Sequence, residues 1–270
     1  MKISFLIFSL LFIPLHCMST SLDIFNDYAG LVSYLNQDPK HYEEFFREIK
    51  PQQERIKITL DKLESLTIDD YIKSSYNQRL AFWINTYNIY VLKILLDHYT
   101  DLKSKKIMKT YFMKNLFDIL CVKIFNKIRT LNQIKKEIFE EEFDDPRVIF
   151  ALYMGAKDGP NLNYYPLHST INIELDQATR RYLEAHLSIN TIHHFIALSS
   201  YMEWWAEEWK EKMISYKYIQ DLQFSERPIK EKLILILLKN HCLEPDAIHS
   251  ALLDPKLKIR FTRFDWVLKY

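Results

Sequence analysis

Glycine is scarce in this sequence, which contains only three glycines in 270 residues. The glycine-rich loops that hold phosphates in nucleotide-binding folds need several positions without a Cβ close together, and neither GxGxxG nor a Walker A pattern occurs. Excess charge is also lacking, because the 36 Lys and Arg residues are nearly balanced by 35 Asp and Glu residues, which leaves a formal charge of +1. A nucleic-acid partner is therefore not expected. What the sequence does have is a hydrophobic share of 48%, enough for a sizeable core.

Long apolar runs are missing as well, except near the start. A basic residue precedes an apolar run that ends at Leu15, and small residues follow around Ser19. This order is typical of a secretory signal peptide, whose run of about a dozen residues is shorter than the roughly 20 needed to cross a bilayer. The alternative, a lipid attached to Cys17, is disfavoured by the bulky residue before it. We expect residues 1–19 to be a signal peptide cleaved near Ser19, residues 20–270 to lack a transmembrane segment, and the protein to be secreted or periplasmic.

Few cysteines remain after such a cleavage. Cys121 and Cys242 could form a disulfide in an oxidising compartment. We favour two separate buried thiols, since two cysteines in a protein with a large core do not make a disulfide scaffold. No CxxC, HExxH or GxSxG pattern occurs, and the adjacent His193 and His194 would point to opposite faces of a strand. The sequence therefore predicts no metal, no cofactor and no catalytic residue.

Apolar residues recur mostly at helical spacing, and no repeat or Pro/Gly/Ser-rich linker divides the chain. We expect a single domain of the α+β class, mostly helical, with a few short strands around a buried central helix at Asn77–His98. Other helices are expected at 25–36, 41–49, 60–66 (capped by Thr59), 131–141 and 173–186, around Trp204–Trp209 and after Pro228. A strand or hairpin is expected at 121–128 and strands at 145–154, 191–198 and 258–266, with an irregular glycine-containing loop after residue 154.

Two asparagines, Asn85 and Asn88, lie three positions apart on the expected central helix, which places them on one face. A buried amide needs specific hydrogen-bond partners, because leaving it unsatisfied costs about 1–3 kcal/mol. Two interpretations stay open. The amides pin neighbouring loops, which we favour, or they contact a ligand.

Arg147 follows Asp145-Pro146 at the start of the expected strand 145–154. An arginine and a flexible loop beside the end of a buried strand are a common setting for a binding pocket. An ordinary salt-bridged turn is the alternative interpretation.

Asp265 lies between two large aromatic residues on the last expected strand, which argues against a solvent-facing position. We expect it either to pair with Arg147 or to hydrogen-bond an asparagine of the central helix, with Trp83 and Trp266 as aromatic walls. The predicted binding residues are therefore Trp83, Asn85, Asn88, Arg147, Asp265 and Trp266.

These segments also carry a resemblance. It rests on Ala81-Phe-Trp-Ile-Asn-Thr-Tyr-Asn88, Asp145-Pro-Arg-Val-Ile-Phe-Ala-Leu152, Leu175–Arg180, Ala197–Trp204 and the terminal Asp265-Trp266. Together they resemble the domain of unknown function 547 family, from about residue 60 to the C-terminus. The biochemical role of that family is not established, so the resemblance by itself implies no activity.

The chain departs from the family pattern at positions that matter for chemistry. The resemblance implies a histidine where this chain has Ile149, and cysteines where it has Met154 and Gly159. It also implies a Glu-His pair where Lys135 and Lys136 stand. A thiolate nucleophile needs a neighbouring base, and thioether and aliphatic groups supply neither role. We therefore expect a catalytically reduced scaffold that binds a small molecule or a protein.

Two other functions stay open. One is a hydrolase-like enzyme whose active site has moved to His168 or His193. The other is binding to an anionic membrane surface through the lysines between Lys103 and Lys114. A histidine in a cleft, within hydrogen-bond reach of another titratable group, would favour the enzyme. An apolar floor formed by Ile149 and Met154 would favour the binding scaffold.

Overall fold

The computed structural model of the protein describes residues 24–36, 47, 49–98, 116–119, 121–167, 170–213, 227–241, 245–254 and 256–266. Several predictions made from the sequence fall elsewhere. The signal peptide at 1–19, nearly all of the helix at 41–49, the lysine segment 103–114, His168 and Cys242 lie outside the described residues.

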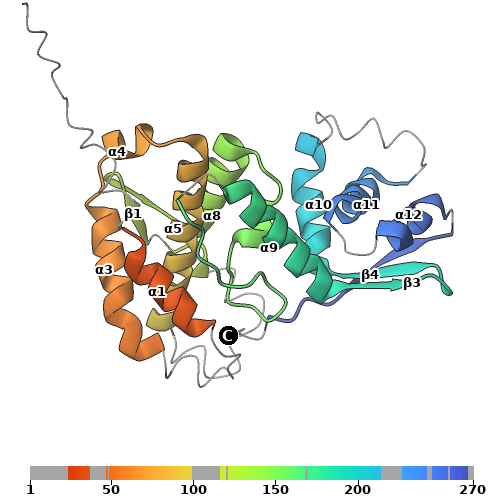
Figure 1. Ribbon diagram of the computed structural model, residues 1–270, viewed down its shortest axis with the longest axis horizontal. Helices are drawn as coiled ribbons and strands as arrows, with labels where there is room; N and C mark the ends of the chain where they lie inside the picture. Colours follow the sequence, from red (N-terminus) through yellow and green to blue (C-terminus); the bar gives the residue numbers. More distant parts are fainter. Residues whose placement is uncertain are drawn as a thin grey trace, which may run out of the picture.

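Helix α5 (Tyr76–Asp97) runs through the middle of the N-terminal part of the molecule (Figure 1). It begins at Ser75, whose hydroxyl accepts a hydrogen bond from the Gln78 backbone N–H, while the Gln78 side chain accepts one from the Ser75 N–H. From Leu80 to Leu95 nearly every side chain is buried. A helix that is apolar around its whole circumference must be enclosed by other elements, so the prediction of a buried central helix is confirmed.

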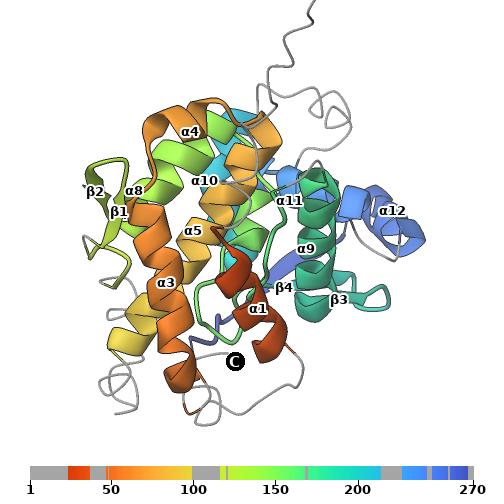
Figure 2. The same cartoon turned by 60° about the vertical axis from the view of Figure 1, so that its left-hand side comes forward.

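The elements around α5 form the first of two hydrophobic clusters. Helix α3 contacts both α1 and α5, and the hairpin of β1 and β2 lies beside α3 (Figure 2). The bounds are α1 Asn26–Leu35, α3 Gln53–Glu64, α4 Ile68–Ile72, β1 Val122–Ile124, β2 Lys127–Arg129 and α8 Leu131–Ile134, which continues as a π-helix over Lys135–Phe143. The helices predicted at 25–36 and 131–141 and the hairpin predicted at 121–128 are confirmed.

A second cluster lies on the C-terminal side of the molecule (Figure 1). Its sheet has the order β3-β4-β5, in which β4 pairs antiparallel with β3 and parallel with β5. Helix α9 connects the two clusters, because it contacts α5, α11 and β4. The bounds are α9 Ile171–His186, β3 Leu187–Asn190, β4 Phe195–Ser199, α10 Ser200–Met213, α11 Ile229–His241, α12 Pro245–Leu253 and β5 Lys258–Thr262.

The strand predicted at 145–154 is wrong. The chain makes a turn at Asp145 and Pro146 and continues as a buried 3₁₀-helix over Val148–Ala151. The Asp145 carboxylate accepts a hydrogen bond from the Arg147 backbone N–H, which stabilises the turn. A short apolar run does not distinguish a buried strand from a buried helical turn, and the local Asx turn decides the outcome here.

Three other boundaries differ from the sequence predictions. Residues 191–194 form a turn, so the strand predicted at 191–198 begins at Phe195. The last strand ends at Thr262, so Asp265 lies beyond it. Thr59 is not a cap, because α3 begins earlier and the Thr59 hydroxyl donates to the Arg55 carbonyl within the helix.

The class predicted from the sequence, mostly helical α+β with short strands, is confirmed. Among the described helices, none combines the length and the apolar character needed to span a bilayer.

Candidate functional site

The two asparagines of α5 hold the backbone of the segment 151–165. Asn88 donates to the Ala151 carbonyl at 3.0 Å and accepts from the Tyr153 N–H at 2.8 Å. Asn85 does the same with the carbonyl and N–H of Tyr165, at 2.6 and 2.9 Å. Both side chains are fully buried. Each amide thus binds one backbone carbonyl and one backbone N–H of the segment, as a neighbouring strand would. This agrees with the interpretation favoured from the sequence, in which the asparagines pin neighbouring loops.

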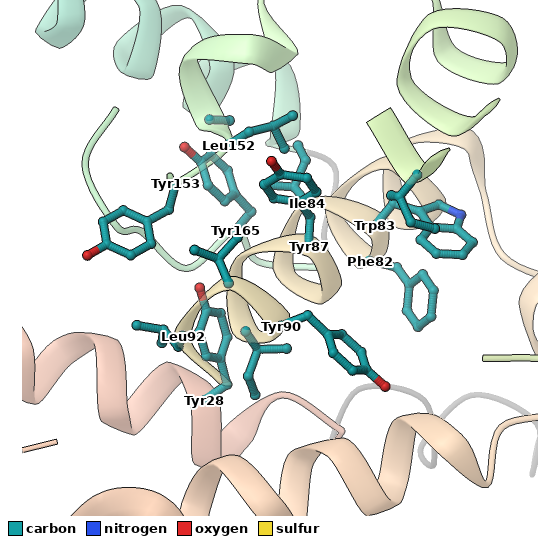
Figure 3. Packing of buried hydrophobic residues seen from close by; sticks show 14 of the residues in the cluster. Tyr28, Phe82, Trp83, Ile84, Tyr87, Tyr90, Leu92, Leu152, Tyr153 and Tyr165 are labelled. Carbon is teal, nitrogen blue, oxygen red and sulfur yellow. The ribbon is translucent and has the colours of Figure 1, made fainter. Parts of the chain in front are cut away.

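More contacts fix this segment from the N-terminal side. The Tyr28 hydroxyl donates to the Asn163 carbonyl at 3.0 Å, and the Asn36 amide donates to the Leu162 carbonyl at 3.2 Å. Figure 3 shows Tyr28 on α1 directed towards Tyr165 across the packed interior. Burial raises the pKa of Tyr28 well above its ordinary value, so its hydroxyl keeps its proton. The segment is therefore held from this side by neutral hydrogen bonds, one from the buried Tyr28 and one from the exposed Asn36.

The positions where the resemblance implies cysteines touch each other. A Cβ built on Gly159 would lie 2.7 Å from Cγ of Met154 and 3.4 Å from its sulfur. The long thioether side chain thus occupies space that any other residue at 159 would need. The hollow beside Gly159, also lined by Tyr182 and His186, has a volume of about 20 Å³, room for about one water molecule.

Ile149 is also part of the packed interior. It is 4% exposed, belongs to the second cluster, and its carbonyl accepts a hydrogen bond from the Tyr201 hydroxyl at 2.9 Å. Lys135, in the π-helix, is paired with Glu208 of α10 at 2.7 Å. Neither residue lines any of three hollows found among the described residues.

Trp83 lies on a different side of α5 from Tyr153 of the pinned segment, as Figure 3 shows. Its indole N–H donates to the Tyr71 hydroxyl at 2.8 Å, and its ring packs edge-on against Phe82 and Phe125. It is 2% exposed. Trp83 is therefore a core residue in an aromatic cluster.

Asp265 makes neither of the two contacts expected from the sequence. Its carboxylate pairs with Lys157 at 3.3 Å, and its backbone N–H donates to the Asp158 carboxylate at 2.7 Å. The neighbouring Trp266 stacks on Trp204 with 5.7 Å between ring centroids. The expectation of a pair with Arg147 is wrong because the chain leaves β5 towards the 157–158 loop and not towards the Arg147 turn.

Arg147 does lie in a cleft, at the turn that follows the π-helix. That helix ends at Phe143, and the next residue, Asp144, has the left-handed φ of 49°. The Tyr76 hydroxyl donates to the Phe143 carbonyl at 2.8 Å, and the Trp205 indole donates to the Pro146 carbonyl at 3.0 Å. The turn is thus held from both α5 and α10.

The Arg147 guanidinium is the centre of an ionic network. Nε and Nη2 donate to the two oxygens of Asp145 at 3.0 and 2.6 Å. Nη1 donates to Asp176 at 2.8 Å, and Nη2 donates a second bond to Asn172 at 2.9 Å. Burial alone would lower the pKa of Arg147, but the hydrogen bonds and charges of Asp145 and Asp176 outweigh it and raise that pKa above its ordinary value. The guanidinium is therefore permanently charged and largely used by the protein itself.

The cleft around this network has a volume of about 480 Å³, in the range of small-molecule sites. By contrast, the hollow between α4 and α5 near Arg79 holds only about 30 Å³. The larger cleft lies between the Arg147 turn, α9 and α11. Its lining consists of apolar walls, carboxylates and the end of α11: Tyr76, Phe143, Asp144, Asp145, Pro146, Arg147, Asp176, Ile236, Leu237, Asn240 and His241.

His241, the last residue of α11, is the titratable group that the sequence interpretation missed. Its Nδ1 lies 3.7 Å from Oδ1 of Asp176, beyond hydrogen-bond distance, and its side chain is 15% exposed. Burial lowers the pKa of His241, and the charges of Arg147 and Arg180 act in the same direction, while Asp176 opposes them. The imidazole is therefore neutral at neutral pH. In the parts of the chain that the structure describes, no three His, Cys, Asp or Glu side chains converge as metal ligands.

The six predicted binding residues do not meet in one place. Only Arg147 lines the cleft, whereas Asn85 and Asn88 hold backbone, Trp83 is buried elsewhere, and Asp265 with Trp266 lies at the 157–158 loop. The sequence missed Asn240 and His241, whose only local signal is a polar end to an apolar helix. Asp176 lies within the Leu175–Arg180 segment of the resemblance, but nothing in that segment indicates its partner.

One comparison with known protein families gives a match. Residues 72–183 match the family described as "Protein of unknown function, DUF547". This segment belongs to the DUF547 family. No curated protein and no solved structure is significantly similar to the chain.

The DUF547 segment supplies only part of the cleft lining. It contains Arg147, its carboxylate partners and the Tyr76 wall, and it also contains both asparagines of α5. Asn240 and His241 come from α11, beyond the matched residues. The cleft is thus formed where the DUF547 segment meets the C-terminal part of the chain.

Proposed function

We propose that the protein is an exported, catalytically reduced DUF547 member that binds a small organic cation in the Arg147 cleft. The observation that carries the proposal is a cleft of about 480 Å³ whose arginine is already engaged by carboxylates. Four of the five N–H donors of a guanidinium are used in the bonds to Asp145, Asp176 and Asn172. Arg147 thus orients the acidic side chains and has little capacity left for an anionic ligand.

The charge of the lining supports a cationic ligand. Asp144, Asp145 and Asp176 contribute three negative charges against the single positive charge of Arg147, and His241 is neutral. Asp176 is the most open of the paired carboxylates, since 45% of its side chain is exposed. The walls include aromatic and aliphatic side chains, which suit the apolar body of an amine. An ammonium group would approach Asp176 while that body lies along α11.

The case against catalysis rests on side-chain chemistry. Met154 and Gly159 supply no thiolate, and Ile149 supplies no base. Burial raises the pKa of Cys121, the half-buried cysteine beside β1, to about 11, so it remains a thiol at neutral pH. A binding role uses the cleft without needing any of these groups.

Thermal-shift measurements on the purified chain test the ligand class. Primary amines with aliphatic or aromatic bodies are compared with carboxylic acids of the same carbon skeletons, because matched pairs isolate the effect of charge. We expect amines to raise Tm and the acids to have no effect. The increment should fall strongly in Asp176→Asn but not in Asp69→Asn, an exposed carboxylate of α4 that does not line the cleft. Stabilisation by the acids, or equal increments in wild type and Asp176→Asn, would contradict the proposal.

A second candidate, an enzyme with a relocated active site, is favoured by one observation. His241 stands in the cleft 3.7 Å from Asp176, and a modest side-chain movement would give a hydrogen-bonded pair. His193, the alternative from the sequence, is exposed in the β3–β4 turn, where its backbone N–H donates to Asn190. Hydrolysis of ester or amide substrates that is lost in His241→Gln would decide for the enzyme.

Export is a separate part of the proposal, and membrane binding is an alternative to the proposal; each has its own test. Expression of the full chain in a secreting host, followed by N-terminal sequencing, should give a mature protein that begins at Thr20. An unprocessed chain would contradict export. Binding to anionic vesicles that disappears in high salt and survives Arg147→Ala would instead assign a surface role to the 103–114 lysines.

A further inference from the structure

The C-terminal sheet carries positive charge on one face and no negative charge at all. Strands β3, β4 and β5 contain no Asp or Glu. Alternate residues of β5 are exposed, so Lys258 and Arg260 lie on one face while Ile259 and Phe261 pack against the second cluster. Lys256, just before the strand, is exposed as well. We call Lys256, Lys258 and Arg260 the basic sheet face.

These three cations lack the partners that neighbouring cations have. Lys230 pairs with Glu203 at 2.9 Å and Arg227 pairs with Glu231 at 3.2 Å, both beside the same sheet. None of the basic sheet face forms an ion pair with a described residue. The Asp254 carboxylate contacts the imidazole of His194 at 2.6 Å and accepts a hydrogen bond from the Lys256 backbone N–H at 2.8 Å. These two hydrogen bonds, with a smaller contribution from the Lys256 charge, lower the pKa of Asp254, but the Lys256 ammonium forms no ion pair with it.

The side chain of Arg260 is oriented by a cation–π contact. Its guanidinium carbon lies 4.4 Å from the ring centroid of Phe195, on the adjacent strand β4. A cation–π contact of this kind fixes the direction of the side chain without neutralising its charge. The charge therefore stays available at a defined position, and the aromatic face beneath it is covered.

The same strand is an edge. In the order β3-β4-β5, β5 pairs with β4 on one side, and no described strand pairs with its other side. Lysines on an edge strand discourage pairing between copies of a protein, because like charges then face each other. The same charges favour an incoming strand that carries carboxylates.

We propose that the free edge of β5 binds an extended acidic segment of a partner protein as an additional strand. Side chains two residues apart in a strand are spaced by about 6.6 Å in both partners, so carboxylates at alternate positions meet Lys258 and Arg260 together. A nucleic acid fits less well, since the chain has a net charge of only +1 and Phe195, the aromatic ring of this face, is covered by Arg260. This site is independent of the Arg147 cleft.

The probe for this proposal is a fluorescein-labelled eight-residue peptide of alternating Glu and Thr, titrated with the full chain and followed by fluorescence anisotropy. We expect binding that Lys258→Glu with Arg260→Glu weakens by roughly tenfold or more. The matched control is Lys73→Glu with Lys127→Glu, which makes the same change in net charge at exposed lysines away from this sheet. The control should bind within about twofold of wild type. Equal affinity of the two double variants would overturn the proposal.

Further probes separate strand addition from other modes of binding. A peptide N-methylated at alternate residues loses the backbone donors of one edge, so its binding should be abolished. Retained binding would reduce the site to a charged patch and overturn the strand model. Tighter binding of oligothymidylate or of phosphatidylserine vesicles through Lys258 and Arg260 would assign the face to those partners and overturn it too. So would a dimer of the free chain that Lys258→Glu with Arg260→Glu dissociates.

Discussion

The asparagines of α5 and the arginine of the cleft are polar groups of the same DUF547 segment, but their surroundings differ in charge and burial. Asn85 and Asn88 are neutral and fully buried, and each binds one backbone N–H and one carbonyl. Arg147 is charged, its side chain is 21% exposed, and its network opens into a cleft. The degree of burial and the kind of hydrogen-bond partner together distinguish the residues that hold the backbone from the residue that lines the cleft.

The difference has a simple energetic origin. A neutral amide can be buried at small net cost when both its donor and its acceptor are satisfied, whereas a buried charge must recover a desolvation penalty of several kcal/mol. The amides of α5 therefore suit the interior. The guanidinium suits the wall of a cleft, where Asp145 and Asp176 balance its charge and water remains near. Mutations of the buried asparagines should therefore lower the free energy of unfolding more than mutations of Arg147.

Asn88→Ala should have the largest effect. It leaves the Ala151 carbonyl and the Tyr153 N–H buried without their partner, at about 1–3 kcal/mol each, so the free energy of unfolding should fall by about 2–6 kcal/mol. Urea unfolding measures the change. Asn77→Ala is the matched control on the same helix, and we expect a change below about 0.5 kcal/mol there. If Asn88→Ala lowered the free energy of unfolding as little as the control does, the buried asparagines would not differ from Arg147 in the way argued above.

Gly159→Ala tests how tightly the pinned segment is packed. The new methyl group would lie 2.7 Å from Met154 Cγ and 3.1 Å from the Ala156 carbonyl, so overpacking should cost about 1–3 kcal/mol. Gly30→Ala in α1 is the control, because its nearest neighbour is 3.7 Å away and a helical alanine should stabilise by about 1 kcal/mol.

The pairing of Met154 with Gly159 is tested by a double-mutant cycle. If the methionine is what blocks residue 159, the cost of Gly159→Ala should be smaller when Met154 is already alanine. Additive costs would show that the Ala156 backbone, and not the thioether, sets the limit. The cycle thereby tests whether the two positions act as one packing unit.

Arg147→Lys should have a smaller effect because the cleft is partly open. Lysine keeps the charge but cannot reach both oxygens of Asp145 and also Asp176, so we expect a loss of about 1–2 kcal/mol in urea unfolding. Arg263→Lys, at an exposed position, should change stability by less than about 0.5 kcal/mol. A loss as large as that of Asn88→Ala would mean that the cleft network is a core element and would weaken the comparison.

The helices were predictable because their signals are local and repeated. In α5 the apolar periodicity and burial agree over many turns. The segment 145–154 failed because its apolar run is short, and hydrogen bonding by Asp145 turned it into a 3₁₀-helix. The capping function assigned to Thr59 failed because the helix begins earlier, a boundary that the apolar pattern alone does not fix.

The candidate site was less predictable than the fold. The turn at Asp145-Pro146 drew attention to Arg147, and that residue does line the cleft. His241 comes from α11, far along the chain, and only the packing of α11 against α9 brings it beside Asp176. The asparagines drew equal attention, because spacing on a buried helix reveals that an amide needs partners but does not reveal whether those partners are backbone or ligand.

The smallest effect should come from His241, and it concerns pH. Burial holds the pKa of His241 below its ordinary value of 6.5, so the unfolded chain binds a proton at a higher pH than the folded chain does. Stability should therefore fall as pH decreases below about 6.5, in addition to any contribution from carboxylates at lower pH. Replacement with glutamine removes the titration, so the stability of His241→Gln should depend less on pH between 6.5 and about 5. Urea midpoints at a series of pH values measure the difference. Should the wild type instead gain stability on acidification in this window, the attraction of Asp176 at 3.7 Å would outweigh burial, and the cleft would hold an imidazolium next to its carboxylates. That outcome would reduce the negative charge on which the preference for a cationic ligand depends.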